Sequence, residues 1–118
     1  MGINGRALIT ENQLQRSCID LLRLRARPDV LWHHSPNECV RENNVIHQIK
    51  MGMKPGFFDL LLLKGPMAHL VEIKVGNGTL NQEQQNVRGW CFKNAVPHKV
   101  VRDLEAFQQI CITWGLFK

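Results

Sequence analysis

The sequence predicts an α/β fold in which helices and strands follow one another in the order αβββαβα. Short apolar runs of strand composition alternate with longer segments that carry apolar residues at helical spacing, and Gly or Pro marks the boundaries between them. The chain has 118 residues, which fits one domain spanning residues 1–118, because domains usually contain about 100–200 residues. We therefore expect one sheet with helices packed on it around a modest core.

Each expected helix begins behind a capping residue. Thr10 and Gln13 have the spacing of a capping box, and Asn81 and Gln84 repeat that spacing at the second helix. Asp103 caps the last helix. Behind these caps apolar residues recur at helical spacing, at Leu14, Cys18, Leu21 and Leu22, at Val87, Trp90 and Cys91, and at Leu104, Phe107, Ile110, Cys111 and Trp114.

The expected strands are short and rich in apolar residues. Residues 30–33 form the first, and residues 96–101 form the last. Between them, residues 57–63 and 68–75 form two strands joined by a loop at residues 64–67, which contains a Gly-Pro pair. These two strands are predicted to make an antiparallel hairpin.

The hairpin brings three charged residues together. A loop from residue 64 to 67 places Leu63 opposite Ala68, and the same register places Asp59 opposite Glu72. Opposed residues of an antiparallel pair point to one face with their Cβ atoms about 4.5–5.5 Å apart, and Lys74 shares that face because strand residues alternate with period two. Two carboxylates and one ammonium group are therefore expected to converge in apolar surroundings.

Facing carboxylates in apolar surroundings require a cation to offset their repulsion and desolvation. Hard divalent cations such as Mg²⁺ prefer oxygen ligands, and a nearby lysine can orient a water molecule. The alternative is a surface ion pair between Glu72 and Lys74 with Asp59 as an incidental neighbour. The hairpin register and the apolar setting together favour a metal site.

These residues also resemble the motifs of a known family. The segments are Gly56-Phe57-Phe58-Asp59, Glu72-Ile73-Lys74 and Gly78-Thr79-Leu80 followed by Gln84. They are similar to the G-x-P-D, E-x-K and G-x-L-x-x-x-Q elements of the virus-type replication-repair nuclease (VRR-NUC) family of PD-(D/E)XK nucleases, except that Phe58 stands where the family usually has proline. The resemblance implies a restriction-endonuclease-like αβββαβ core, with a central mixed sheet flanked by helices, plus a C-terminal helix.

The resemblance also implies roles for individual residues. Asp59 and Glu72 would be metal ligands together with the backbone carbonyl of Ile73, and Lys74 would position the attacking water. The implied cofactor is Mg²⁺, for which Mn²⁺ would be able to substitute.

Two further residues match the family but have competing explanations. Glu11 resembles an additional family acid that completes the site directly or through water, yet a glutamate in the first turn of a helix is equally expected from the helix dipole. Gln84 matches an active-site glutamine, yet it also stands where a capping box needs one. For Gln84 the resemblance favours the active-site role.

The chain carries a net charge of +5, with 15 Lys and Arg against 10 Asp and Glu, which suits an anionic partner such as DNA. Candidate DNA contacts are Asn37, Lys50, Lys54 and Arg88, although each basic residue taken alone is more often a solvated surface charge. We interpret them only as a group.

The function expected from these residues and the resemblance is a metal-dependent DNA endonuclease. With no room for a separate sequence-reading domain, selectivity for branched DNA such as Holliday junctions is expected, in a phage or bacterial replication-repair setting. The resemblance also implies a homodimer. The expected interface is the last helix with Phe107, Trp114 and Phe117, because a domain this small cannot bury all of it internally. The alternative from another class is a DNA-binding module of nuclease fold with little catalysis.

The location expected from the sequence is the cytoplasm of a bacterial or phage-infected cell. The longest apolar runs are much shorter than the roughly 20 residues of a membrane-spanning helix, and the first residues lack a secretory signal. Cys18, Cys39, Cys91 and Cys111 form no C-x-x-C pair and are expected to be reduced thiols.

Overall fold

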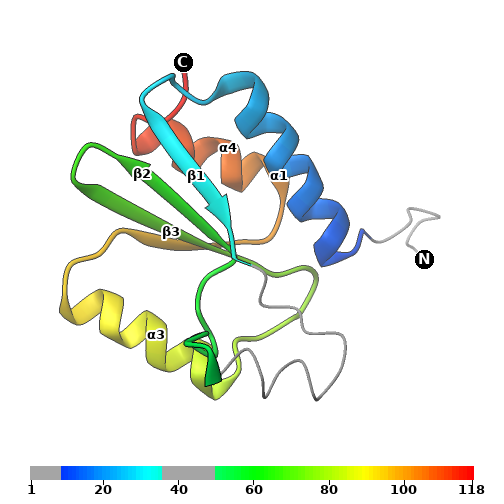
Figure 1. Cartoon of the computed structure of the whole chain (residues 1–118). Helices are drawn as coiled ribbons and strands as arrows, with labels where there is room; N and C mark the ends of the chain where they lie inside the picture. Colours follow the sequence, from blue (N-terminus) through cyan, green and yellow to red (C-terminus); the bar gives the residue numbers. More distant parts are fainter. Residues whose placement is uncertain (1–8, 36–49) are drawn as a thin grey trace, which may run out of the picture.

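The computed structural model describes residues 9–35 and 50–118 of the chain (Figure 1). Within these ranges the elements are α1 (Glu11–Arg25), β1 (Val30–His34), β2 (Leu60–Lys64), β3 (Met67–Ile73), α3 (Gln82–Lys93), β4 (His98–Val101) and α4 (Leu104–Thr113). This order confirms the predicted αβββαβα succession of an α/β fold.

The four strands form one mixed sheet in the order β1-β2-β3-β4. β1 pairs antiparallel with β2, β2 pairs antiparallel with β3, and β3 pairs parallel with β4. A parallel pair needs a crossover connection, and α3 provides it. Figure 1 shows the result: α1 and α4 cover one face of the sheet and α3 lies on the other.

The hydrophobic core has a part on each face of the sheet. Beneath α1 and α4 the buried residues are Leu14, Cys18, Leu22, Leu60, Leu62, Val71, Ile73, Val101, Phe107, Cys111, Leu116 and Phe117. A smaller cluster beneath α3 consists of Phe58, Leu70, Val87 and Cys91. Because strand residues alternate, Leu70 and Glu72 point to the α3 face while Val71 and Ile73 point into the larger core.

The predicted register of the hairpin is confirmed. Leu60 pairs with Val71 and Leu63 with Ala68, and the last pair before the turn is Lys64 with Met67. Gly65 has a φ of +57°, which glycine adopts without strain, and Pro66 follows it. The turn therefore contains two residues instead of the predicted four, and the strand begins at Leu60, later than predicted.

All three predicted helix caps are present. Thr10 and Gln13 form a capping box at α1, and Asn81 and Gln84 form one at α3. The Asp103 carboxylate accepts a hydrogen bond from the backbone N–H of Ala106 at 2.7 Å. These local bonds set where each helix begins.

The predicted dimer interface at the last helix is wrong. Phe107 is 0% exposed and Phe117 is 6% exposed, and Trp114 packs half-buried against the same core. The reason is that the chain after α4 folds back beside the end of α1, where Phe117 forms a β-bridge with Ala26. The apolar side chains expected to contact a second copy therefore pack within the same chain.

Trp90 also departs from its predicted place in the apolar stripe of α3. Val87 and Cys91 are buried under the helix, but the side chain of Trp90 is 58% exposed. On the α3 face, the sheet presents only a small apolar cluster. Only the side chains of α3 that face this cluster are buried, and Trp90 lies outside that buried row.

The cysteines within the described residues are free thiols. Cys18, Cys91 and Cys111 are all buried, and burial raises the pKa of Cys18 and of Cys111 to about 12. These thiols are protonated and unreactive at neutral pH. Cys39 and the candidate DNA contact Asn37 lie outside the described residues.

Across residues 9–35 and 50–118, none of the helices combines the length and apolar character needed to cross a membrane.

Replacing Phe107 with alanine should lower the free energy of unfolding by about 3–5 kcal/mol, because the ring is fully buried at the junction of α4 with the sheet. Urea denaturation followed by circular dichroism measures the loss. Ile112→Ala on the same helix is the control, since Ile112 is 46% exposed, and it should cost about 1 kcal/mol or less. Equal losses for the two variants would contradict the position assigned to Phe107.

Candidate active site

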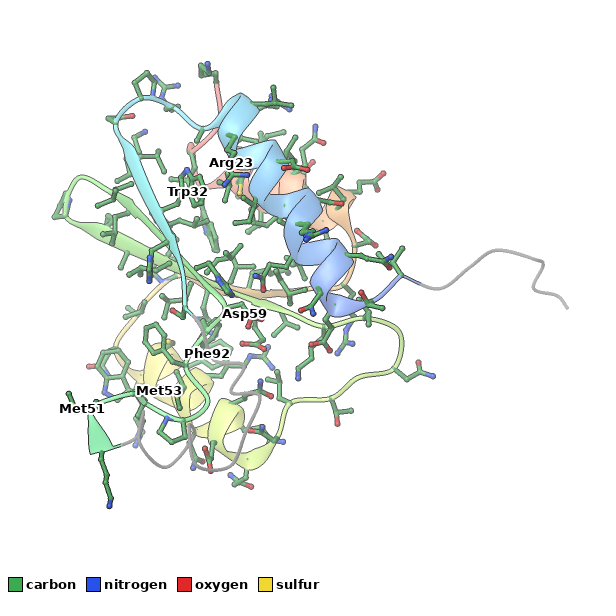
Figure 2. The ribbon with its side chains drawn as sticks, turned by 45° about the vertical axis from the view of Figure 1, so that its right-hand side comes forward. Arg23, Trp32, Met51, Met53, Asp59 and Phe92 are labelled. Atoms are coloured by element: carbon green, nitrogen blue, oxygen red, sulfur yellow. The ribbon has the colours of Figure 1, made fainter. Side chains whose placement is uncertain are left out.

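One pocket of about 410 Å³ is lined by all five residues whose side chains the sequence assigned to a common site. It lies where the starts of α1 and α3 approach the ends of the β2–β3 hairpin, and Figure 2 shows Asp59 in the space between α1 and α3. The lining residues are Thr10, Glu11, Asn12, Asp59, Glu72, Lys74 and Gln84. The sequence analysis did not predict that Asn12 and Thr10 line this pocket. It identified Thr10 only as a helix cap.

Asp59 is held by two bonds at the entrance to β2. Its Oδ2 accepts a hydrogen bond from the backbone N–H of Ile73 at 2.7 Å, and its carbonyl oxygen accepts one from Ser35 N–H at 2.8 Å. The backbone pairing of β2 with β3 ends at Leu60, so the predicted strand pair of Asp59 with Glu72 is replaced by this side-chain bond. Asp59 therefore meets β3 through its carboxylate instead of its backbone.

The backbone of β3 faces the site at Ile73. Lys74 N–H donates to the Val101 carbonyl of β4 at 3.0 Å, whereas Ile73 N–H points the other way, to Asp59. In a strand, the N–H and C=O of one residue lie on the same side. The Ile73 carbonyl consequently faces the Asp59 side, as a ligand role requires, while its side chain stays in the core.

Glu72 is a buried carboxyl group, 4% exposed, on the α3 face of the sheet. Its pKa is raised from 4.5 to about 9, first by burial and then by the charge of Asp59 and a side-chain hydrogen bond with it. Lys74 opposes this shift, and Glu11 adds a small increase. Without a cation in the site, Glu72 therefore keeps its proton at neutral pH.

Gln84 fills both roles that the sequence left open. Its Oε1 accepts from the backbone N–H of Asn81 at 2.9 Å, which completes the capping box of α3. Its Nε2 donates to Glu72 Oε2 at 3.0 Å. The cap thus fixes the amide in the orientation that reaches Glu72.

Glu11, the first residue of α1, lines the pocket. Within residues 9–35 and 50–118, no three His, Cys, Asp or Glu side chains are grouped closely enough to bind one metal ion together. Glu11 therefore flanks the pair of Asp59 and Glu72 without forming a three-acid cluster with it. Its position is compatible with contact through a bridging water.

Gly56 explains why the segment before Asp59 can approach α3. Its φ is +80°, and a Cβ at this position would lie 2.6 Å from the carbonyl oxygen of Glu83 and 2.7 Å from the backbone nitrogen of Gln84. Real Cβ atoms do not come so close. Glycine therefore allows the loop that carries Asp59 to rest directly on the first turn of α3, which carries Gln84.

The remaining candidate DNA contacts do not line this pocket. Lys50 is exposed, and Lys54 borders a different pocket together with Phe57, Asn86, Val87 and Trp90. Arg88 borders a third pocket, on another side of α3, with Arg102, which the sequence did not indicate. The signal that was missed is the position of Arg102 directly after the last strand.

The donor groups of the pocket suit a hard divalent cation. The two facing carboxylates and the Ile73 carbonyl are all oxygen donors, which is the set that Mg²⁺ and Mn²⁺ prefer. Burial and the neighbouring Asp59 carboxylate raise the pKa of Glu72, and a cation bound between the two carboxyl groups would act against both effects. The residues present therefore fit such an ion.

Together these features define an α/β fold of restriction-endonuclease type with a carboxylate pair, a lysine and a glutamine in one pocket. No protein-family model and no curated protein matches the sequence. A solved structure titled "VRR_NUC domain protein" is similar, with a TM-score of 0.68 and 20% sequence identity over 88% of this chain and 87% of that chain. This likeness confirms the fold that the motif resemblance implied.

Replacing Gly56 with alanine should destabilise the protein by more than about 2 kcal/mol, because the new methyl group strains φ and collides with the backbone of Glu83 and Gln84. Gly65→Ala is the matched control. Gly65 also has a positive φ, of +57°, but open space around it, so its loss should be about 1 kcal/mol. Both are measured by urea denaturation, and equal losses would contradict the close approach at Gly56.

The stability of the metal-free protein should fall as pH rises from about 4.5 to 9. Glu72 has a pKa raised from 4.5 to about 9 in the folded state, so between these values the folded state holds one proton more than the unfolded state. The free energy of unfolding then decreases with pH, by up to about 1.4 kcal/mol per pH unit.

Urea denaturation in EDTA across this pH range measures the slope. Glu72→Gln should remove most of the slope and should be the more stable protein at pH 8. Glu83→Gln, at an exposed position on α3, should keep the slope of the wild type. Parallel curves for wild type and Glu72→Gln would show that Glu72 is not the group responsible.

Proposed function

We propose that this chain is a metal-dependent deoxyribonuclease of the VRR-NUC family, within the PD-(D/E)XK nucleases. The observation that carries the proposal is the buried carboxylate pair of Asp59 and Glu72, which shares one pocket with Lys74 and Gln84. The spacing of these residues resembles the family motifs, and the fold is similar to the structure titled "VRR_NUC domain protein". Motif and fold thus support the same family independently.

Asp59, Glu72 and the Ile73 carbonyl would hold Mg²⁺, with Mn²⁺ able to replace it and Glu11 contributing through water. When bound, the ion neutralises charge on the phosphoryl oxygens and lowers the pKa of a water molecule. Asp59 is already fixed for this role by the backbone N–H of Ile73. Glu72 is held by the Gln84 amide, which donates to its Oε2 at 3.0 Å.

Lys74 supplies the positive charge on the protein side of the pocket. Its ammonium group can donate a hydrogen bond to the attacking water and hold it in line with the leaving oxygen, which is the orientation that phosphodiester hydrolysis needs. Gln84 donates to Glu72 and holds this side chain in place. The protein groups therefore position reactants and place charge, and none needs to form a covalent intermediate.

The proposed substrate is branched DNA, such as a Holliday junction, in replication or repair. The net charge of +5 favours a polyanion such as DNA. We propose a homodimer, so that two sites can act on two strands, with an interface elsewhere than the buried aromatic residues of α4. The proposed location is the cytoplasm of a bacterial or phage-infected cell.

The test is cleavage of a labelled four-way junction, a flap and a linear duplex in Mg²⁺ or in EDTA. Asp59→Asn and Lys74→Met should each lower kcat/KM by about 10²-fold or more, because the first removes a proposed metal ligand and the second removes the group that positions the attacking water. Asp29→Asn, in the exposed turn between α1 and β1, should leave the rate unchanged.

Cleavage that survives EDTA, or that Asp59→Asn leaves intact, would overturn the metal mechanism. Binding of junctions without cleavage of any substrate would favour a DNA-binding module of nuclease fold. Equal cleavage of the three substrates would support a nuclease and contradict selectivity for branched DNA.

A further inference from the structure

The pocket bordered by Arg88 and Arg102 has a volume of about 480 Å³. It is formed by α3, by the turn after β3 and by the residue that follows β4. Its lining residues are Thr79, Leu80, Gln85, Arg88, Gly89, Phe92 and Arg102. No acidic side chain is among them, so we call it the arginine pocket.

Arg102 is held in place by the turn that follows Lys74. Its Nη1 donates to the carbonyl oxygen of Gly78 at 2.7 Å and to that of Gly76 at 3.3 Å. Lys74 and Arg102 each follow a strand of the parallel pair β3–β4, and the carboxyl ends of parallel strands meet at one edge of a sheet. Arg102 therefore lies at the same edge as the proposed catalytic lysine.

Arg88 is oriented by an aromatic side chain of its own helix. Its guanidinium carbon lies 5.3 Å from the ring centroid of Phe92, one turn further along α3. Phe92, labelled in Figure 2, is braced by the ring of His98, with centroids 4.5 Å apart and planes at 81°. Arg88 thus loses little additional side-chain freedom when it binds a ligand.

Neither arginine has an acidic partner among the described residues. The ion pairs there join Arg23 to Asp20 and Arg27 to Asp29, both far along the chain from the pocket. Two guanidinium groups that share a pocket without a carboxylate repel one another. An anion with several oxygen acceptors would relieve that repulsion, and phosphate matches the fork of donors on each guanidinium.

The position of the pocket relates it to the carboxylate site. Gln84 lines the carboxylate site and Arg88 lines the arginine pocket, one helical turn apart on α3. One turn is about 5.4 Å, and a strand of duplex DNA rises about 3.4 Å per nucleotide. The rise along α3 from Gln84 to Arg88 is thus comparable with one to two nucleotides of one strand.

We propose that the arginine pocket binds a phosphodiester of the DNA backbone next to the scissile one, with Arg88 and Arg102 as its ligands and Phe92 as a positioning residue. The inference rests on the proposed nuclease function and adds a second phosphate subsite to it. Because the contacts are to the backbone, they carry no base preference. The subsite would therefore orient the DNA strand over Asp59 and Glu72.

Gly89 allows a direct test, because a Cβ at this position would have no atom within 4 Å. A longer side chain can therefore enter the arginine pocket without disturbing the core, and replacing a glycine inside a helix favours folding. Gly89→Glu adds a carboxylate there, and Gly89→Gln adds a neutral side chain of the same shape. The comparison separates charge from obstruction.

The measurement is fluorescence anisotropy of labelled duplex and four-way junction DNA, in EDTA, across a series of salt concentrations. Gly89→Glu should weaken binding about tenfold more than Gly89→Gln at low salt, and the two should converge as salt rises. Arg88→Gln and Arg102→Gln should each lower the salt slope by about 1. Arg27→Gln, beyond the far end of α1, is the control and should bind as the wild type does.

Equal affinities of Gly89→Glu and Gly89→Gln, with salt slopes of Arg88→Gln and Arg102→Gln equal to that of Arg27→Gln, would overturn the subsite. So would a wild type that binds no DNA. Arg102 also tethers the turn after Lys74, so Arg102→Gln can alter stability. In that case the proposal is judged on the Arg88 and Gly89 variants alone. The assay measures no cleavage, so failure of the nuclease activity and failure of the subsite are separately visible.

Discussion

The burial of the Glu72 carboxyl group beside Asp59 is the constraint on which the rest of the site depends. A carboxylate that leaves water and faces a second one is strongly disfavoured unless each oxygen finds a partner. The chain meets part of this demand with the Gln84 amide on Glu72 and the Ile73 N–H on Asp59. What remains is a deficit of positive charge, which a divalent cation or a retained proton can fill.

The fold brings these partners together from three separate places. The hairpin sets Asp59 beside the end of β3, and the crossover through α3 returns the chain to the same edge of the sheet with Gln84 at its first turn. Gly56 allows the two segments to touch. The capping box is also part of this assembly, because the bond that begins α3 is the one that aims Gln84 at Glu72.

The distribution of charge around the site follows the same logic. Both acids that the hairpin brings together are turned inward to one pocket, and the arginines of the neighbouring pocket have no acidic partner among the described residues. A modest net charge of +5 therefore becomes a locally strong positive edge next to a pair of carboxylates. Such an edge attracts a polyanion and leaves the carboxylates to a cation.

By itself, the sequence determined the element order, the three helix caps, the hairpin register and the meeting of Asp59, Glu72 and Lys74, because caps, turns and strand alternation are set by residues a few positions apart. The place of Gln84 beside them was indicated by the motif resemblance. Only the tertiary structure decided that Asp59 bonds through its side chain, that Phe107 and Phe117 are core, that Trp90 is exposed and that Arg102 joins Arg88. These depend on which surfaces of distant segments cover one another, and short-range patterns carry no information about that.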